Sequence, residues 1–271
     1  MSEQNIALVT GASSGFGLLT AKKLVEAGYR VLGTSRSPGP ETPSGFEMLE
    51  LEVASTASVT ACVNGVLERC GRIDLLVNNA GRGHRSLLEE TSMQDAASVF
   101  ETNFWGVVRV TNAVLPAMRA RKSGLIINVS SLAGLVGAPG QGFYAASKHA
   151  LEAYTETLRV ELSHLPVEVS MVEPGFFRTG FRNAMIPPGP PIDDYDAIRP
   201  IVESKIEEGF SAAGDPEIVA DAILSIARRG GEKMRHRIGE DAKRISRMKK
   251  WIPERLFMSG MLRNFGLDQT D

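Results

Sequence analysis

Apolar residues along the chain form short runs that alternate with longer stretches of helical spacing. The runs have the length and composition of strands, and the stretches between them repeat apolar positions every three to four residues. Strands are predicted over residues 6–9, 29–34, 46–53, 73–77, 125–129, 167–172 and 233–238. Helices are predicted over residues 18–27, 56–70, 92–121, 142–164, 201–209, 217–229 and 240–265. This alternation indicates an α/β fold with a parallel sheet of about seven strands and helices on both faces.

Two stretches depart from this pattern. Residues 178–214 are irregular and rich in Pro and Asp. A segment of this kind in a compact domain usually has a function, so a substrate lid is predicted there. Residues 240–271 form a C-terminal helical extension that is basic and amphipathic. It could lie on a membrane surface or a partner, or pack its apolar face on the domain.

Composition narrows the class of protein. The 271 residues are 43% hydrophobic and 23% charged, which fits one soluble domain over residues 1–271. A net charge of −2 gives no indication of a nucleic-acid partner. The polar start and the lack of an apolar run of ~18 residues predict a cytoplasmic protein. The Cys and His residues are scattered, so no metal site is expected.

A glycine-rich turn follows the first strand directly and opens the first helix. Gly11, Gly15 and Gly17 have the spacing G-x-x-x-G-x-G. Glycines in this position let the backbone approach a pyrophosphate at the helix N-terminus, although a tight turn between packed elements is an alternative. The candidate cofactor contacts of the turn are Gly11, Ser13, Ser14, Gly15, Phe16 and Gly17.

The second strand ends at Ser35 and Arg36, with no acidic residue at its tip. An acidic residue there would bind the ribose hydroxyls of NAD, whereas Arg suits the 2′-phosphate of NADP. The pair therefore favours NADP(H), the alternative being a solvated loop arginine. Further candidates follow other strand ends, where open α/β sheets bind ligands, namely residues 78–81, Ser131 and residues 174–175.

Tyr144 and Lys148 lie four residues apart at the start of a predicted helix, which places them on one face. A phenol has an ordinary pKa of about 10, and a neighbouring ammonium would lower that pKa. The pair could serve as an acid–base device. A tyrosine beside a solvated lysine is the alternative.

Together these residues resemble the short-chain dehydrogenase/reductase family over about residues 5–180, in a subgroup similar to 17β-hydroxysteroid dehydrogenases. The resemblance implies a Rossmann-type doubly wound fold and a catalytic tetrad of Asn103, Ser131, Tyr144 and Lys148. The family spacing of thirteen residues before the tyrosine selects Ser131 over Ser130. The resemblance adds cofactor contacts at Asn79, Ala80, Gly81, Tyr144, Lys148, Pro174, Gly175, Phe177 and Thr179. The family often has Asp where this chain has Glu52, so Glu52 and Val53 are expected near the adenine.

The implied activity is NADP(H)-dependent interconversion of a hydrophobic ketone or aldehyde and an alcohol. Tyr144 would transfer the proton, Ser131 would position the oxygen, and Lys148 would lower the tyrosine pKa and hold the ribose. Asn103 would order a water that links Lys148 to solvent. The family also implies a homodimer or homotetramer, formed through the helices that start near Ser92 and Gly142. One alternative is a non-catalytic NADP(H)-binding regulator or scaffold. Another is a sugar-nucleotide epimerase or dehydratase, although the glycine spacing argues against it.

The substrate would meet an apolar pocket with polar residues at one side. His84 and Arg85 could reach a polar end of the substrate or could be solvated loop residues. The predicted apolar lining is Leu135, Val136, Phe143, Phe176, Phe177, Phe181, Met185 and Ile186.

Overall fold

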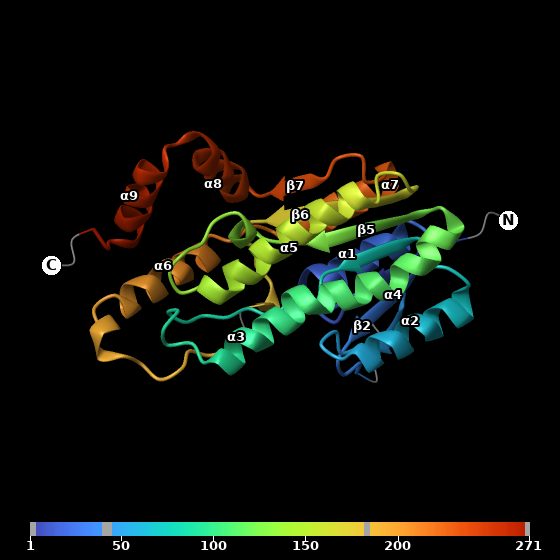
Figure 1. Cartoon of the computed structure of the whole chain (residues 1–271), viewed down its shortest axis with the longest axis horizontal. Coiled ribbons are helices and arrows are strands. Elements are labelled where there is room, and N and C mark those ends of the chain that lie inside the picture. Colours follow the sequence, from blue (N-terminus) through green and yellow to red (C-terminus); the bar gives the residue numbers. More distant parts are fainter. Residues whose placement is uncertain (1–3, 40–44, 182–184, 269–271) are drawn as a thin grey trace.

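The computed structural model describes residues 4–39, 45–181 and 185–268, so parts of the predicted lid and of the C-terminal extension lie outside the described residues. Seven parallel strands form one central sheet in the order β3-β2-β1-β4-β5-β6-β7 (Figure 1). The strands are β1 (Ile6–Val9), β2 (Arg30–Ser35), β3 (Glu47–Glu50), β4 (Leu75–Asn78), β5 (Gly124–Val129), β6 (Val167–Pro174) and β7 (Arg235–Ile238). The predicted doubly wound α/β fold is confirmed.

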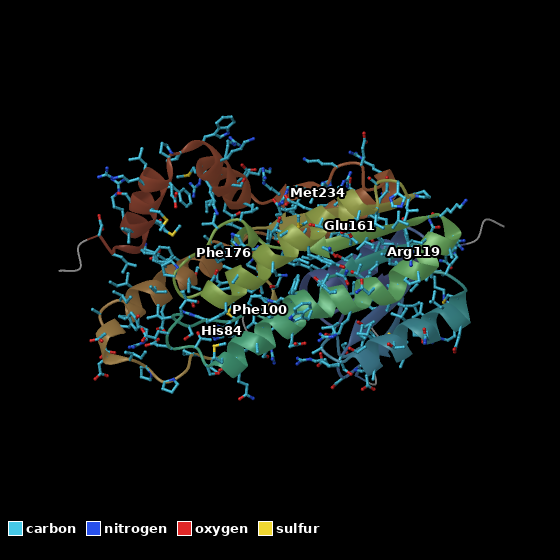
Figure 2. All side chains as sticks on the ribbon, in the orientation of Figure 1. His84, Phe100, Arg119, Glu161, Phe176 and Met234 are labelled. Carbon is cyan, nitrogen blue, oxygen red and sulfur yellow. The ribbon has the colours of Figure 1, made fainter. Side chains whose placement is uncertain are left out.

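Alternate residues of each central strand enter two separate cores. Ile6 and Leu8 of β1 point into one core, and Ala7 and Val9 point into the other. The first core is completed by α2 (Thr56–Cys70), α4 (Gly106–Arg121) and α5 (Gly142–Glu161). The second is completed by α1 (Gly15–Glu26) and α7 (Glu217–Arg229). Side chains fill both layers (Figure 2), which explains why the strands read as nearly continuous apolar runs.

The helix predicted over residues 92–121 is interrupted. It consists of α3 (Met93–Phe100), a π-helical turn η1 (Glu101–Trp105) and α4. Asn103 lies within this turn and is fully buried. Its amide bonds to the backbone of Arg82 and to Ser147, and the wider turn directs it inward. Helical periodicity alone could not reveal the interruption.

The strand predicted over residues 46–53 is shorter than expected, because β3 ends at Glu50. The backbone N–H of Glu52 donates to Ser58 Oγ at 3.0 Å, and the Glu52 carboxylate accepts from the Ala54 N–H at 3.0 Å. These bonds begin two residues after the strand ends, and they direct the chain towards the start of α2 at Thr56.

The C-terminal extension forms two helices, α8 (Glu240–Trp251) and α9 (Glu254–Phe265), because Pro253 cannot continue the first helix. The helix predicted near residues 201–209 is α6 (Arg199–Ser211). Leu87, Val202, Ile206 and Phe265 form a third apolar cluster that joins α6 and α9 to the loop after β4. In Figure 1, α6, α8 and α9 project beyond the end of the sheet where the strands finish.

The lid segment, residues 178–214, is tied to the domain through Glu90, which is 4% exposed. Glu90 Oε1 accepts the Ile192 N–H at 2.9 Å and pairs with Arg199 Nη2 at 2.5 Å. The hydrogen bond from Arg199 holds the pKa of Glu90 below its ordinary value. Within the described part of the chain, no helix is both long enough and apolar enough to pass through a membrane.

Buried amides connect the layers behind the sheet edge. Asn78 Nδ2 donates to Asn128 Oδ1 at 2.9 Å and to Thr111 Oγ1 at 3.1 Å, and Asn128 Nδ2 donates to Thr155 Oγ1 at 2.9 Å. The chain of bonds runs from α4 through β4 and β5 to α5. It holds the helix that carries Tyr144 and Lys148 in register with the strands.

Replacing Asn128 with Ala should therefore reduce the free energy of unfolding by about 1–3 kcal/mol, because a buried donor of Asn78 loses its acceptor. Urea unfolding followed by circular dichroism measures this change. Asn64→Ala, on the exposed face of α2, is the matched control and should change the free energy by less than about 0.5 kcal/mol. Equal effects of the two substitutions would contradict the role of the amide chain.

Candidate active site

The carboxyl ends of the strands open into one cavity of about 1310 Å³. The chain leaves β1 towards β2 and β3 on one side and occupies β4 to β7 on the other, so the order reverses between β1 and β4. Open α/β sheets bind ligands at such a reversal. All predicted catalytic and cofactor-binding residues except Gly17 and Asn103 line this cavity.

The glycine turn is built around close backbone approaches. Gly11 has φ +67, and a Cβ on it would lie 2.9 Å from the Ala80 Cα. A Cβ on Gly17 would overlap the Gly11 carbonyl oxygen and lie 2.5 Å from Asn79 Nδ2. Gly17 is therefore required for the packing of the turn, although it does not line the cavity. Phe16 packs edge-on against Phe177, with ring centroids 5.8 Å apart.

A residue that the sequence analysis did not single out, Thr10, joins this turn to the next strand. Its Oγ1 accepts the backbone N–H groups of Asn79 and Ala80 at 2.9 and 3.0 Å. Asn79 Nδ2 donates in return to the carbonyls of Thr10 and Gly11, at 2.9 and 3.1 Å. The amide of Asn79 thus braces the turn. The position of Thr10 directly before Gly11 is the signal that could have identified it.

The end of the cavity near β2 presents a hydroxyl and a guanidinium. Ser35 Oγ is buried and makes no hydrogen bond within the described part of the chain, and Arg36 is exposed at the cavity edge. A buried hydroxyl without a partner beside a guanidinium suits an anion with several acceptor oxygens. Glu52 and Val53 line the same end, but the Glu52 carboxylate is engaged with the Ala54 N–H.

Ser131, Tyr144 and Lys148 meet at the centre of the cavity. Because α5 begins at Gly142, Tyr144 lies in its first turn and Lys148 one turn later. Burial raises the pKa of Tyr144 above its ordinary value, and a hydrogen bond with Ser131 partly opposes this rise. This pair agrees with the choice of Ser131, since Ser130 Oγ donates instead to Glu152.

Lys148 is buried beside Tyr144 and is bonded to the backbone of β5. Its Nζ donates to the Val129 carbonyl at 2.8 Å and lies 6.0 Å from the centre of the Tyr144 ring. Burial lowers the pKa of Lys148 to about 8, and the charge of Glu152 acts in the opposite direction. Burial is the main cause of the raised pKa of Tyr144, so the expected lowering of that pKa by Lys148 stays a prediction.

Asn103 lies beside this group without lining the cavity. Its Oδ1 accepts the Arg82 N–H at 2.7 Å, and its Nδ2 donates to the Arg82 carbonyl at 2.9 Å and to Ser147 Oγ at 3.1 Å. A Cβ on Gly81 would lie 3.5 Å from Asn103 Oδ1 and 4.0 Å from Lys148 Nζ. The amide therefore holds the loop after β4 next to Lys148.

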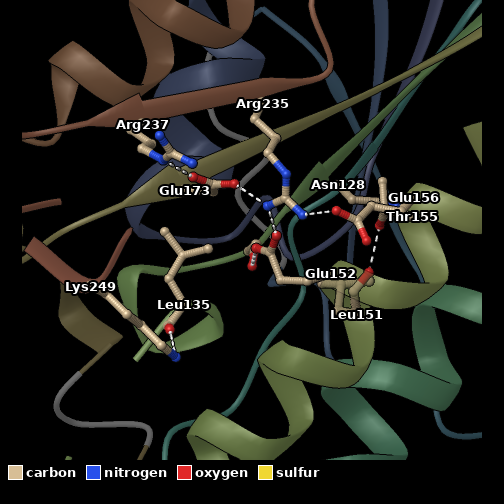
Figure 3. Close-up of polar contacts among 11 residues, drawn as sticks. Asn128, Leu135, Leu151, Glu152, Thr155, Glu156, Glu173, Arg235, Arg237 and Lys249 are labelled. Atoms are coloured by element: carbon tan, nitrogen blue, oxygen red, sulfur yellow. Dashed lines mark hydrogen bonds and ion pairs between the residues drawn. The ribbon is translucent and has the colours of Figure 1, made fainter. Parts of the chain in front are cut away.

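An ion cluster that the sequence analysis did not predict lies behind Ser130. Arg235 of β7 pairs with Glu152 and Glu156 of α5 and with Glu173 of β6, and Arg237 pairs with Glu173 at 3.0 Å (Figure 3). Burial raises the pKa of Glu152 to about 7. The position of Glu152, four residues after Lys148, was the only sequence signal. The cluster links β7, and so the C-terminal helices, to the serine loop.

The far end of the cavity is mainly apolar. Of the predicted lining, Val136, Phe176, Phe177, Phe181 and Met185 are confirmed, whereas Leu135, Phe143 and Ile186 do not line the cavity. The remaining wall comes from α6, which belongs to the predicted lid segment, and from α8 and α9, which the sequence did not assign to the pocket. Its apolar members are Ile206, Phe210, Ile245, Met248, Ile252, Leu256, Phe257, Met261 and Phe265.

His84 and Arg85 have different positions. Arg85 Nη2 donates to the Glu203 carbonyl at 3.0 Å, and its Nη1 lies 3.5 Å from Glu207 Oε2, so this side chain is engaged with α6. His84 lines the cavity and is 2% exposed. The prediction that Arg85 could reach the substrate is thus not supported by its contacts, and the prediction of a solvated His84 is wrong.

The site agrees with comparisons to known proteins. A family profile described as "short chain dehydrogenase" matches residues 5–187. The chain belongs to the short-chain dehydrogenase family. A 3-ketodihydrosphingosine reductase of Bacteroides thetaiotaomicron is 38% identical, with 94% of this chain and 95% of the relative covered. Retinol dehydrogenase 8 of Bos taurus is 36% identical, with 85% and 80% covered.

Solved structures of this family superpose over most of the chain. A short-chain dehydrogenase from Streptomyces avermitilis has a TM-score of 0.84 and 31% identity, with both chains fully covered. A relative from Burkholderia phymatum in complex with NAD has a TM-score of 0.80 and 27% identity, with 92% and 95% covered. One from Burkholderia cenocepacia in complex with NADP has a TM-score of 0.76 and 27% identity, with 95% and 97% covered. The chain is thus an oxidoreductase with a fold that binds nicotinamide dinucleotides.

A methyl group on Gly17 should disrupt the cofactor turn, because the Gly11 carbonyl and the Asn79 amide would have to move. We expect Gly17→Ala to weaken NADPH binding at least about ten-fold, or roughly 1.4 kcal/mol, in a nicotinamide fluorescence titration. Gly65→Ala is the control, since a Cβ at this position in α2 meets open space. Wild-type affinity in the Gly17 variant would refute the close approach.

Proposed function

We propose that the protein is an NADP(H)-dependent oxidoreductase that interconverts a hydrophobic ketone or aldehyde and the corresponding alcohol. The observation that carries this proposal is one cavity that joins the glycine turn to Ser131, Tyr144 and Lys148. A dinucleotide laid over the turn would bring its reactive ring to the tyrosine. Ser35 and Arg36 support NADP(H), because they supply a hydroxyl and a guanidinium for the 2′-phosphate.

In the proposed mechanism, Tyr144 is the general acid of the reductive direction. Its raised pKa keeps the phenol protonated at neutral pH, so its Oη can donate to the carbonyl oxygen of the substrate. Ser131 donates a hydrogen bond to the same oxygen and orients it. When bound, the nicotinamide supplies the hydride to the carbonyl carbon. Hydride and proton together convert the carbonyl to an alcohol.

Lys148 has two roles in this proposal. Its ammonium holds the nicotinamide ribose, and its charge stabilises the phenolate that remains after proton donation. We assign Asn103 as a positioning residue for Lys148, because its amide bonds hold the loop against α5. The contacts of Pro174, Gly175, Phe177 and Thr179 with the cofactor are part of the same proposal and are supported by their place in the cavity wall.

The substrate is proposed to be an apolar molecule with an extended hydrocarbon part. The wall beyond Tyr144 is built from aromatic and aliphatic residues of the lid segment, α6, α8 and α9. The names of two relatives, 3-ketodihydrosphingosine reductase and retinol dehydrogenase 8, support this choice of an apolar substrate. The lid segment is proposed to close over this substrate.

Two kinds of partner belong to this proposal. Trp105 and Val160 expose 47% and 72% of their surface on the helices expected to form a homodimer or homotetramer. Contact between a membrane surface and α8 and α9 is supported by apolar residues that point outward among basic ones. These exposed residues, which do not line the cavity, are Trp251, Met258 and Leu262.

Removing the tyrosine hydroxyl should abolish most of the turnover. Tyr144→Phe is expected to lower kcat for ketone reduction by ~10²–10⁴-fold, because the general acid is lost. NADPH affinity should stay near the wild-type value. Tyr154→Phe, on the same helix but facing the core, is the control and should remain active. Near-normal turnover of the Tyr144 variant would refute the mechanism and reopen the non-catalytic alternative.

The choice of cofactor depends on Arg36. Arg36→Ala should weaken NADPH binding by about ten- to a hundred-fold, the usual loss of a charged hydrogen bond, and leave NADH binding unchanged. Fluorescence titrations with both cofactors measure this difference. Arg30→Ala, at the other end of β2, is the matched control. Equal affinities for the two cofactors, unaltered in the variant, would show that NADP(H) is not preferred.

A further inference from the structure

His84 is a buried histidine whose hydrogen-bonding groups are unused. The side chain is 2% exposed, and neither Nδ1 nor Nε2 has a hydrogen-bond partner among the residues that the structure describes. The other histidines of the chain differ: a ring nitrogen of His149 and of His236 lies 2.9 Å from a backbone carbonyl oxygen, and His164 is exposed. Burying an imidazole without partners is unfavourable, and such groups in native proteins usually have a functional explanation.

The loop after β4 and the lid segment hold His84 in the cavity wall. Its backbone pairs with Ile186 of the lid, and the Ile186 N–H donates to the Gly83 carbonyl at 3.0 Å. Figure 2 shows His84 on the loop that leads into α3. The neighbouring Arg85 is held by α6, so it does not compete for the cavity.

The ring of Phe181 lies next to both the Tyr144 ring and Gly83, the residue that precedes His84. It lies 5.7 Å from the Tyr144 ring, and a Cβ on Gly83 would lie 2.9 Å from its edge. A molecule whose carbonyl lies at Tyr144 would therefore meet His84 with a different part of its structure. Phe181 and Met185, which a Cβ on Gly83 would meet, have no side-chain N–H or O–H group.

The charge state of His84 defines the group that it could bind. Burial lowers the pKa of His84 below its ordinary value, so the ring is neutral at neutral pH. A neutral imidazole has one donor and one acceptor. A hydroxyl group can accept from the first and donate to the second. A carboxylate only accepts and would carry a charge into a buried region.

We propose that His84 binds a second, uncharged polar group of the substrate, a hydroxyl separated from the reacting carbonyl. The substrate class is then a hydroxyketone with an otherwise hydrocarbon skeleton, and the product is a diol. This inference rests on the proposed function, because it assumes that the carbonyl is reduced at Tyr144. It adds a residue that selects among hydrophobic ketones.

The test compares dodecanones of equal length, one without a hydroxyl and others with a hydroxyl one, two or three carbons from the carbonyl. We expect the wild-type protein with NADPH to reduce at least one hydroxyketone with a kcat/KM about ten-fold or more above that of the parent ketone. His84→Phe should abolish this preference, so that the ratio of kcat/KM for the hydroxyketone to kcat/KM for the parent ketone falls to about one. His84→Asn keeps a donor and an acceptor and should restore part of the preference. His164→Phe is the matched control.

A stability measurement separates recognition from a structural role. His84→Phe removes two unsatisfied buried nitrogens, so its Tm should equal or exceed that of the wild type, with unchanged NADPH affinity. An unaltered ratio of hydroxyketone to ketone turnover in His84→Phe would overturn the inference, as would an equal loss for both substrates. Reduction of the parent ketone without any hydroxyketone preference in the wild type would overturn it and leave the proposed function intact. Failure to reduce any ketone would overturn both.

Discussion

The hydrogen bonds between Thr10 and the Asn79–Ala80 backbone hold the ends of β1 and β4 together, and the rest of the site is placed relative to this junction. In a parallel sheet buried on both faces, the carboxyl ends of the strands are the main places where the backbone can meet a ligand. The junction determines how far the strand ends separate. The glycine turn lies on one side of it, and the loop held by Asn103 lies on the other.

Electrostatic effects of burial then set the chemistry of the site. The same desolvation that keeps Tyr144 protonated makes Lys148 a weaker base, and Glu152 partly compensates for the lysine. Glu152 is also bound by Ser130 and Arg235. Removing one partner from a buried ion cluster generally destabilises the folded state, because it leaves an uncompensated buried charge. The strand that leads to α8 and α9 is consequently coupled to the serine loop through charge as well as through packing.

Most of the fold could be predicted because both cores leave a regular apolar pattern in the sequence. Residues 56–70 are helical with the predicted boundaries, and the cofactor turn lies between the predicted strand and helix. The features that were missed depend on tertiary contacts without a local signature. Thr10, Glu152 and the walls from α8 and α9 are of this kind, as is the pKa of Tyr144, which depends on burial. His84 could be proposed only as one of two neighbouring candidates, since no periodicity tells which side chain a loop turns inward.

The π-helical turn at Glu101–Trp105 has a consequence for the length of this part of the chain. Such a turn contains one residue more than an α-helical turn, and each residue rotates a helix by about 100°. The positions that face the core in α3 and in α4 are therefore offset by about one residue relative to a continuous α-helix. Deleting one residue here would make α3 and α4 one continuous α-helix. Ala96 and Val99 could then no longer face the core together with Val110 and Val114. A substitution on the exposed face of this helix preserves the alignment of its apolar positions, whereas a change of its length does not.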